Sequence, residues 1–216
     1  MSLLARWVGR AGGPPVDAAR WVVLDVESTG LDMWHDELLA IAAVALRVDG
    51  ERGPCIALSD SFEATLHHAA PTVDKDNILL HGIGVAAQRS GMPPHDALVA
   101  FEQWVGRSPL IAFHAAFDEA MIGRAMHKHL KHRLPNPWLD LAPVAGALYP
   151  EVGARTLDEW LVCFSIDCAQ RHQAAADTLA TAELLLRLWP EARRKQCTTF
   201  KGLTDLARHR RWLGGG

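Results

Sequence analysis

Short apolar runs rich in β-branched residues alternate along the chain with longer segments whose apolar residues recur at helical spacing. Runs of the first kind predict strands. The first three runs lie too close together for a crossover helix, so they are expected to pair antiparallel. The predicted strands are 20–27 (RWVVLDVE), 37–50, 60–68, 108–115 and the first residues of 138–149.

Segments with helical spacing account for most of the remaining pattern. Thr156 and Glu159 have the spacing of a capping box, and Pro190 is expected to end the last helix of the pattern. This order of elements predicts an α/β fold in which a mixed β-sheet, three antiparallel strands followed by parallel strands, is flanked by helices. The predicted helices are 74–84, 93–106, 116–132, the second half of 138–149, 156–164 and 174–192.

The 216 residues are enough for one α/β domain with a substantial core. The stretch before that domain is rich in glycine and proline and is interpreted as an N-terminal extension, 1–19. The periodic pattern then covers 20–192. The remaining segment, 193–216, is locally basic. It is expected to be a solvated tail, with a partner-binding segment as the alternative.

Composition narrows the class of protein. An apolar fraction of 49% and a charged fraction of 22% are typical of soluble globular proteins. A net charge of −3 argues against a broad basic face, so nucleic acid would be contacted locally or through bound cations. The four cysteines have no CxxC spacing, which favours reduced thiols and a cytoplasmic protein. No apolar run approaches the ~20 residues of a membrane span, so no membrane contact is expected.

Two carboxylates mark the end of the first predicted strand. Asp25 and Glu27 are two residues apart, so both side chains leave the same face of that strand. Like charges at such close range repel unless a cation lies between them, and ionised carboxylates suit Mg²⁺ or Mn²⁺. The alternative is an exposed strand end with two solvated acids.

Further candidates lie downstream. Asp118 follows a second buried strand at the start of a helix, and Asp177 is the lone charge in AAADTLATA. A helix N-terminal acid alone would explain Asp177. His172 precedes Asp177 by five residues, a gap that does not share a helix face, so His172 is placed in the preceding loop. Asp140 is expected to cap the helix that follows it.

Together these residues resemble the DEDD superfamily of 3′→5′ exonucleases, in its DnaQ-like DEDDh branch. The segments LDVESTGLD, LIAFHAAFD and RHQAAADTLATAELLL are similar to the three motifs of the family, in order, and HGI at 81–83 matches a shorter element. The sister branch replaces the histidine with tyrosine, and the only tyrosine here, Tyr149, lies far upstream of Asp177. The resemblance covers about residues 20–190 and implies a ribonuclease H-like fold.

The resemblance also implies the chemistry. Two divalent metal ions, Mg²⁺ or Mn²⁺, would be held by Asp25, Glu27, Asp118 and Asp177. His172 would act as general base, and Glu27 also counts among the catalytic residues. Two ions in a phosphodiester site activate the attacking water and stabilise the leaving oxygen.

The same resemblance implies a set of substrate contacts. Leu31 would wedge against the terminal base, and Gly30 would permit close backbone approach. Ordinary core packing is the alternative for Leu31, Ile83 and Phe117. His114 replaces the asparagine common in the second motif, and Ser28 replaces a common threonine. The implied substrate-binding residues are Thr29, Gly30, Leu31, His81, Ile83, His114 and Phe117.

The expected function is therefore release of 5′-mononucleotides from DNA 3′ ends, single-stranded or frayed, in proofreading or repair. HGI and RHQAAAD are closer to the DNA-proofreading type, which favours DNA. One alternative is the same chemistry on RNA or short oligonucleotides. Another is a polymerase-associated adaptor, for which a DNA polymerase subunit would be the partner.

Overall fold

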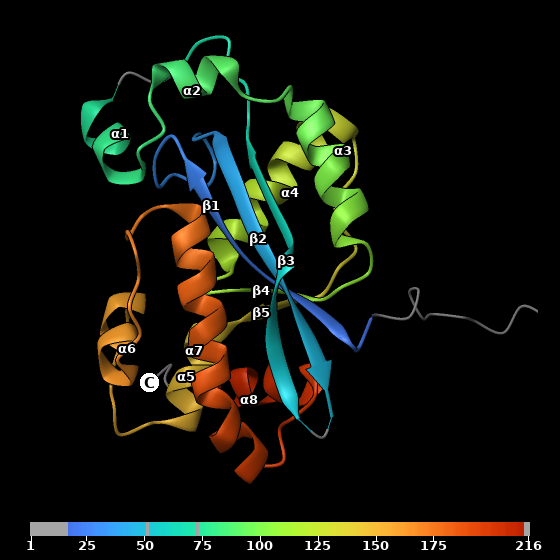
Figure 1. Cartoon of the computed structure of the whole chain (residues 1–216), viewed down its shortest axis with the longest axis vertical. Helices are drawn as coiled ribbons and strands as arrows, with labels where there is room; N and C mark the ends of the chain where they lie inside the picture. Colours follow the sequence, from blue (N-terminus) through green and yellow to red (C-terminus); the bar gives the residue numbers. More distant parts are fainter. Residues whose placement is uncertain (1–16, 51, 72–73, 214–216) are drawn as a thin grey trace, which may run out of the picture.

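The computed structural model of the chain describes residues 17–50, 52–71 and 74–213 (Figure 1). The strands are β1 (Arg20–Ser28), β2 (Leu38–Asp49), β3 (Gly53–Thr65), β4 (Leu110–Ala112) and β5 (Trp138–Asp140). The helices are α1 (Lys75–His81), α2 (Val85–Ser90), α3 (Pro94–Val105), α4 (Ala116–Leu130), α5 (Leu141–Leu148), α6 (Leu157–Phe164), α7 (Ala174–Arg194) and α8 (Phe200–Leu213). Among these, no helix is long and apolar enough to cross a membrane.

The five strands form one mixed sheet in the order β3-β2-β1-β4-β5. β1, β2 and β3 pair antiparallel, whereas β4 and β5 run parallel to β1. The predicted fold class is therefore confirmed. β3 begins at Gly53, earlier than the predicted start, because its pairing with β2 extends down to Asp49. α2 was not predicted, since its six residues are too few to show a helical period.

Side chains of β1 alternate between two cores. Val22 and Leu24 belong to the cluster that packs against α3 and α4. Trp21 and Val23 belong to the cluster on the opposite face, which contains residues of α5, α6, α7 and α8. Because the period of a strand is two residues, Asp25 and Glu27 emerge on the face of Trp21 and Val23, which α7 covers (Figure 1).

α7 lies close against the sheet. Its small residues permit this approach, and the Thr178 hydroxyl donates a hydrogen bond to the Ala42 carbonyl of β2 at 3.1 Å. The prediction that Pro190 ends this helix is wrong, because α7 continues to Arg194. Proline removes one backbone donor, but Trp189 and Ala192 on either side are buried in the core and hold the helical path.

The segment after α7 is not a solvated tail over its described length. Residues 200–213 form α8, and Leu203 and Ala207 are buried in the same core as Trp21. The ring of Phe200 packs edge-on against Trp21 with centroids 5.7 Å apart. The helix was not predicted because basic residues dominate the segment and only a few apolar residues recur at helical spacing.

Helix ends follow the local sequence. The capping box at Thr156 and Glu159 is confirmed, with both of its reciprocal hydrogen bonds formed. Asp140 caps α5 as predicted by accepting from the Ala142 N–H at 3.2 Å. α1 ends at Gly82, whose φ of 75° is the left-handed conformation that glycine adopts without strain.

Candidate active site

The two acids of β1 lie where the sheet meets the N-terminal end of α7. Burial, first, and the nearby Asp177 raise the pKa of Asp25 to about 8. Burial and then the charges of Asp25 and Asp177 raise the pKa of Glu27 to about 8, against a main-chain hydrogen bond from Ala174. Glu27 Oε1 is buried and has no hydrogen-bond partner in the described structure. Both carboxyl groups therefore stay protonated to a pH well above the usual range for Asp and Glu.

Asp118 approaches the same place from α4. It lies in the first turn of the helix that follows β4 and is 3% exposed. Burial, followed by the charge of Asp25, raises its pKa well above the usual value. The pairing of β1 with β4 reaches only Val23, and the main chain of Val26 beyond it hydrogen-bonds to the Asp118 carboxylate. The end of β1, which pairs with β2 but extends beyond β4, thus positions this acid.

Asp177 stands in the first turn of α7 and is 6% exposed. Its Oδ2 accepts from the main-chain N–H of His172 at 3.1 Å, and its Oδ1 accepts from Cys168 Sγ at 3.6 Å. The Arg171 guanidinium forms an ion pair with the same carboxylate. Arg171 also donates to Asp158 of α6 at 2.5 Å. An arginine is therefore the local cation of the acidic cluster.

His172 occupies the loop before α7, as predicted. Its side chain is exposed, and its φ of 61° is left-handed, an uncommon conformation for a residue with a β-carbon. Its main chain is tied to Asp177, so the imidazole projects from a loop anchored at the acidic cluster.

The chemistry of the donors fits divalent cations. Asp25, Glu27, Asp118 and Asp177 are coupled through their charges, and the unpartnered Glu27 oxygen lacks a cation or a donor. In the described part of the chain, no three Asp, Glu, His or Cys side chains are arranged closely enough to hold one ion. Side-chain rotation would have to accompany metal binding, and Asp177 would exchange Arg171 for the ion.

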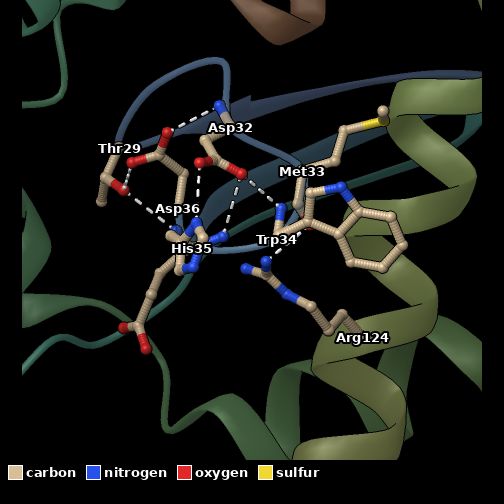
Figure 2. A network of polar contacts seen from close by, with 8 residues as sticks. Thr29, Asp32, Met33, Trp34, His35, Asp36 and Arg124 are labelled. Atoms are coloured by element: carbon tan, nitrogen blue, oxygen red, sulfur yellow. Dashed lines mark hydrogen bonds and ion pairs between the residues drawn. The ribbon is translucent and has the colours of Figure 1, made fainter.

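The loop after β1 carries the first group of predicted substrate residues. The Thr29 hydroxyl donates to Asp36 Oδ1 at 2.7 Å and accepts from the Glu37 N–H at 2.9 Å (Figure 2). A β-carbon on Gly30 would lie 2.5 Å from Asp36 Oδ2, so any larger residue would require the Asp36 carboxylate to move. Leu31 is 88% exposed, which argues against the core-packing alternative for this residue.

The other predicted substrate residues lie at the end of α1, in the α1–α2 connection, in the turn before α4 and in α4. His81 is buried at the end of α1, where its Nδ1 accepts from the Ile83 N–H at 2.9 Å, and burial lowers its pKa. Ile83 is half-buried. Phe117 packs partly against the core on the α3 and α4 face.

The hydrogen bonds of His114 connect it to Asp140 and Arg155. Its main-chain N–H donates to Asp140 Oδ1 at 3.0 Å, and its Nε2 lies 3.2 Å from the carbonyl oxygen of Arg155. It also has a left-handed φ of 61°. Asparagine, the residue common at this position in the family, tolerates the same backbone conformation, which gives the substitution a physical basis.

Sequence reasoning missed Arg171 as a member of this site. It directly precedes His172, but its reach to both Asp158 and Asp177 depends on how α6 and α7 pack. Asp158, two residues after the capping threonine, was also not predicted to belong to this site. The only available signal was a basic residue next to the histidine.

A mixed sheet with buried acids at the end of β1, covered by a helix that contributes another acid, is the arrangement of ribonuclease H-like nucleases. The family model described as Exonuclease (RNase_T) matches residues 22–185. The chain belongs to this exonuclease family. The family is in general dependent on divalent metal ions.

Curated relatives are much longer proteins. The chain is 33% identical over 176 residues to the PolC-type DNA polymerase III of Bacillus subtilis, which covers 81% of this chain and 12% of that protein. It is 32% identical over 167 residues to the same type of polymerase from Clostridium perfringens, with 76% and 11% covered. The chain thus spans about an eighth of the length of these relatives.

Solved structures share the fold. Cell-death related nuclease 4 superposes with a TM-score of 0.66 at 16% identity, over 80% of this chain and 64% of that one. E. coli Exonuclease I in complex with a dT13 oligonucleotide superposes with a TM-score of 0.65 at 17% identity, over 82% and 42%.

Proposed function

We propose that this protein is a metal-dependent 3′→5′ exonuclease that removes 5′-mononucleotides from single-stranded or frayed DNA. The observation that carries the proposal is the convergence of four acids at the end of β1: Asp25, Glu27 and Asp118 are buried with raised pKa values, and the charge of Asp177 acts on Asp25 and Glu27. Acids held this close in a buried site suit the binding of cations and, through them, of a phosphodiester.

The residues have distinct roles in the proposed reaction. Divalent ions held by the four carboxylates would supply the Lewis acidity that activates water and stabilises the leaving oxygen. His172 accepts the proton of the attacking water as the new P–O bond forms and the bond from phosphorus to the 3′ oxygen breaks. The departing 3′ oxygen takes a proton from solvent, which leaves a strand shorter by one nucleotide.

Substrate positioning is assigned to the surrounding loops. Leu31 is exposed in the loop between β1 and β2, shortly after Glu27. This position suits contact with the terminal base. Gly30 lets the backbone approach that nucleotide, and Thr29 fixes the loop through Asp36. The proposed nucleotide pocket is completed by His81 and Ile83 from α1 and the connection after it, and by His114 and Phe117 from the turn before α4 and from α4.

The test is a time course on oligonucleotides of identical sequence as DNA and as RNA, labelled at either the 3′ or the 5′ end. With Mg²⁺ or Mn²⁺, we expect immediate release of the 3′ label as a mononucleotide and a ladder from the 5′-labelled strand. EDTA and Asp25→Asn should abolish both, whereas Asp96→Asn, an exposed acid of α3, should not. Activity in Asp25→Asn, or cleavage from the 5′ end, would refute the proposal, and faster hydrolysis of RNA would reassign the substrate.

The resemblance to the polymerases also supports a proofreading role. We propose that the protein works beside a DNA polymerase. In support, the chain is similar to a segment of the PolC-type DNA polymerase III relatives. The test uses two primers that differ only at the 3′ nucleotide, which is mismatched in one and paired in the other. Excision of the mismatched nucleotide at least several-fold faster would support the proofreading role. Equal rates would contradict it.

A further inference from the structure

The loop between β1 and β2 is held by a dense set of its own hydrogen bonds (Figure 2). Asp36 Oδ2 accepts from the Asp32 N–H at 2.8 Å, and Asp32 Oδ1 accepts from the Trp34 N–H at 2.7 Å. Asp32 Oδ2 also lies 2.7 Å from His35 Nδ1. With the contacts of Thr29, these bonds give the loop a defined shape without using the side chain of Trp34.

Trp34 is therefore an unusual surface residue. Its side chain is 79% exposed although its main chain is fixed. Because its main chain is already held, Trp34 loses little backbone freedom when a flat partner stacks on the indole. Leu31, three residues earlier, is the other strongly exposed apolar side chain of the loop.

A cation lies beside the indole. Arg124 of α4 donates from Nη1 to the main-chain carbonyl of Met33 at 2.6 Å, so its charge meets a neutral oxygen there. Figure 2 shows Trp34 and Arg124 on the side of the loop that faces α4. The carboxylates of Asp32 and Asp36 are engaged within the loop, and that of Glu37 is engaged by Lys128 and His68.

A groove continues from Arg124 along α4. Its volume is about 340 Å³, and its lining includes Lys128 and His129 from α4, His67 and His68 after β3, and Glu37, which is paired with Lys128 and His68. Basic and imidazole side chains thus extend away from the loop that begins two residues after Glu27. α4 also carries Asp118 in its first turn, so the same helix contributes to both the groove and the acidic cluster.

We propose that Trp34 and Arg124 form a subsite for the strand upstream of the terminal nucleotide. A base stacks on the indole of Trp34, Arg124 contacts the adjoining phosphate, and the groove along α4 receives the next part of the strand. The occupant is a single-stranded nucleic acid, because the platform is aromatic and its neighbour is cationic. The inference rests on the proposed function.

The experiment compares two substrates. Labelled dT10 reaches beyond the terminal nucleotide, whereas thymidine 5′-(p-nitrophenyl phosphate) has no upstream nucleotide. Trp34→Ala should lower the ratio of kcat/KM on dT10 to kcat/KM on the ester by about tenfold, the scale of one lost base stack. Trp34→Phe should restore most of that ratio. Arg124→Gln should lower it too and reduce the salt dependence of KM on dT10 by about one phosphate contact.

Leu58→Ala provides the matched control, because Leu58 is an exposed apolar residue of β3 outside this loop. An unchanged ratio in Trp34→Ala would overturn the subsite and leave the exposed indole to a protein partner. Binding of fluorescent dT10 by anisotropy, with the metal chelated, is the second measurement. If the wild type hydrolyses neither substrate, the proposed function fails. If Trp34→Ala binds dT10 as tightly as the wild type, the subsite fails.

Discussion

Arg171 and Asp177 form an ion pair at the N-terminal end of α7, and the same guanidinium holds Asp158 of α6. The arginine thereby neutralises one of the four carboxylates assigned to the metal ions. Under the proposed function, a divalent cation would have to take Asp177 from Arg171, while Asp158 could retain the guanidinium. The arginine would then compete with the metal for one ligand, which gives the first prediction.

Arg171→Gln should bind Mn²⁺ about tenfold more tightly, because a change of ~1.4 kcal/mol in the cost of releasing Asp177 corresponds to that factor. The measurement is titration calorimetry at pH 9, where the carboxylates of Asp25 and Glu27, with pKa about 8, are largely ionised. Arg194→Gln, which removes an exposed ion pair to Glu191, is the control. Weaker Mn²⁺ binding in Arg171→Gln would show that Arg171 supports the ions rather than competes with them.

The metal-free protein should lose stability as the pH rises. The pKa values of Asp25 and Glu27 are about 8 in the folded chain and near 4 when unfolded, so folding favours their protonated forms. Their contribution to stability is complete below about pH 4 and disappears as the pH rises through about 8. Thermal denaturation in EDTA should give a lower Tm at pH 8.5 than at pH 5.5, and Mg²⁺ should recover part of the loss.

Asp25→Asn with Glu27→Gln supplies the comparison for that experiment, since it removes both titrating groups. We expect a flatter dependence of Tm on pH and a smaller effect of Mg²⁺. An equally steep dependence in the double variant would assign the pH effect to other groups.

His172→Asn isolates the role of the imidazole. Asparagine tolerates the left-handed φ of 61°, so the main-chain bond to Asp177 should persist. Loss of a general base is expected to lower kcat by about 10²-fold or more, with little change in KM. A normal kcat would remove His172 from the proposed mechanism.

Gly30→Ala tests the shape of the loop. The added methyl would lie 2.5 Å from Asp36 Oδ2, so the bonds of Asp36 to Thr29 and Asp32 must rearrange. KM on dT10 should rise several-fold, while the free energy of unfolding falls by roughly 1 kcal/mol. Gly50→Ala is a matched control, because nothing lies within 4 Å of its added methyl. Equal behaviour of the two variants would show that the loop tolerates the rearrangement.

Leu203→Ala tests whether α8 belongs to the folded core. Leu203 is fully buried against the α5 side of the sheet, so its truncation should lower the free energy of unfolding by about 2–5 kcal/mol. Chemical denaturation measures this change, and Lys201→Ala, on the exposed face of the same helix, should have little effect. A negligible change at Leu203 would restore the solvated-tail prediction.

Much of the fold could be predicted because its signals are local. The alternation along RWVVLDVE placed Asp25 and Glu27 on one face, and the short spacing of three strands gave their antiparallel pairing. Pro190 misled the prediction because the loss of one backbone donor is small beside the burial of Trp189 and Ala192. α8 was missed because its charged residues outnumber the few that reach the core.

The site was predictable only in part. Acids that follow strands or begin helices are visible in one dimension, which is why four carboxylates could be proposed together. Neither Arg171 nor Trp34 has a comparable signal in the sequence. The first acts through a long side chain that spans two helices, and the second matters through what surrounds it in space, the engaged acids of its loop and the cation of α4.

The two-residue period of β1 constrains how such a site can vary. Inserting or deleting a single residue early in this strand would move both acids to the face of the sheet that packs against α3 and α4. Val22 and Leu24 would move to the opposite face. Changes of length are therefore tolerable only in the connections beyond the strand. Diversity of substrate choice should accumulate in the β1–β2 loop, while the strand itself changes by substitution alone.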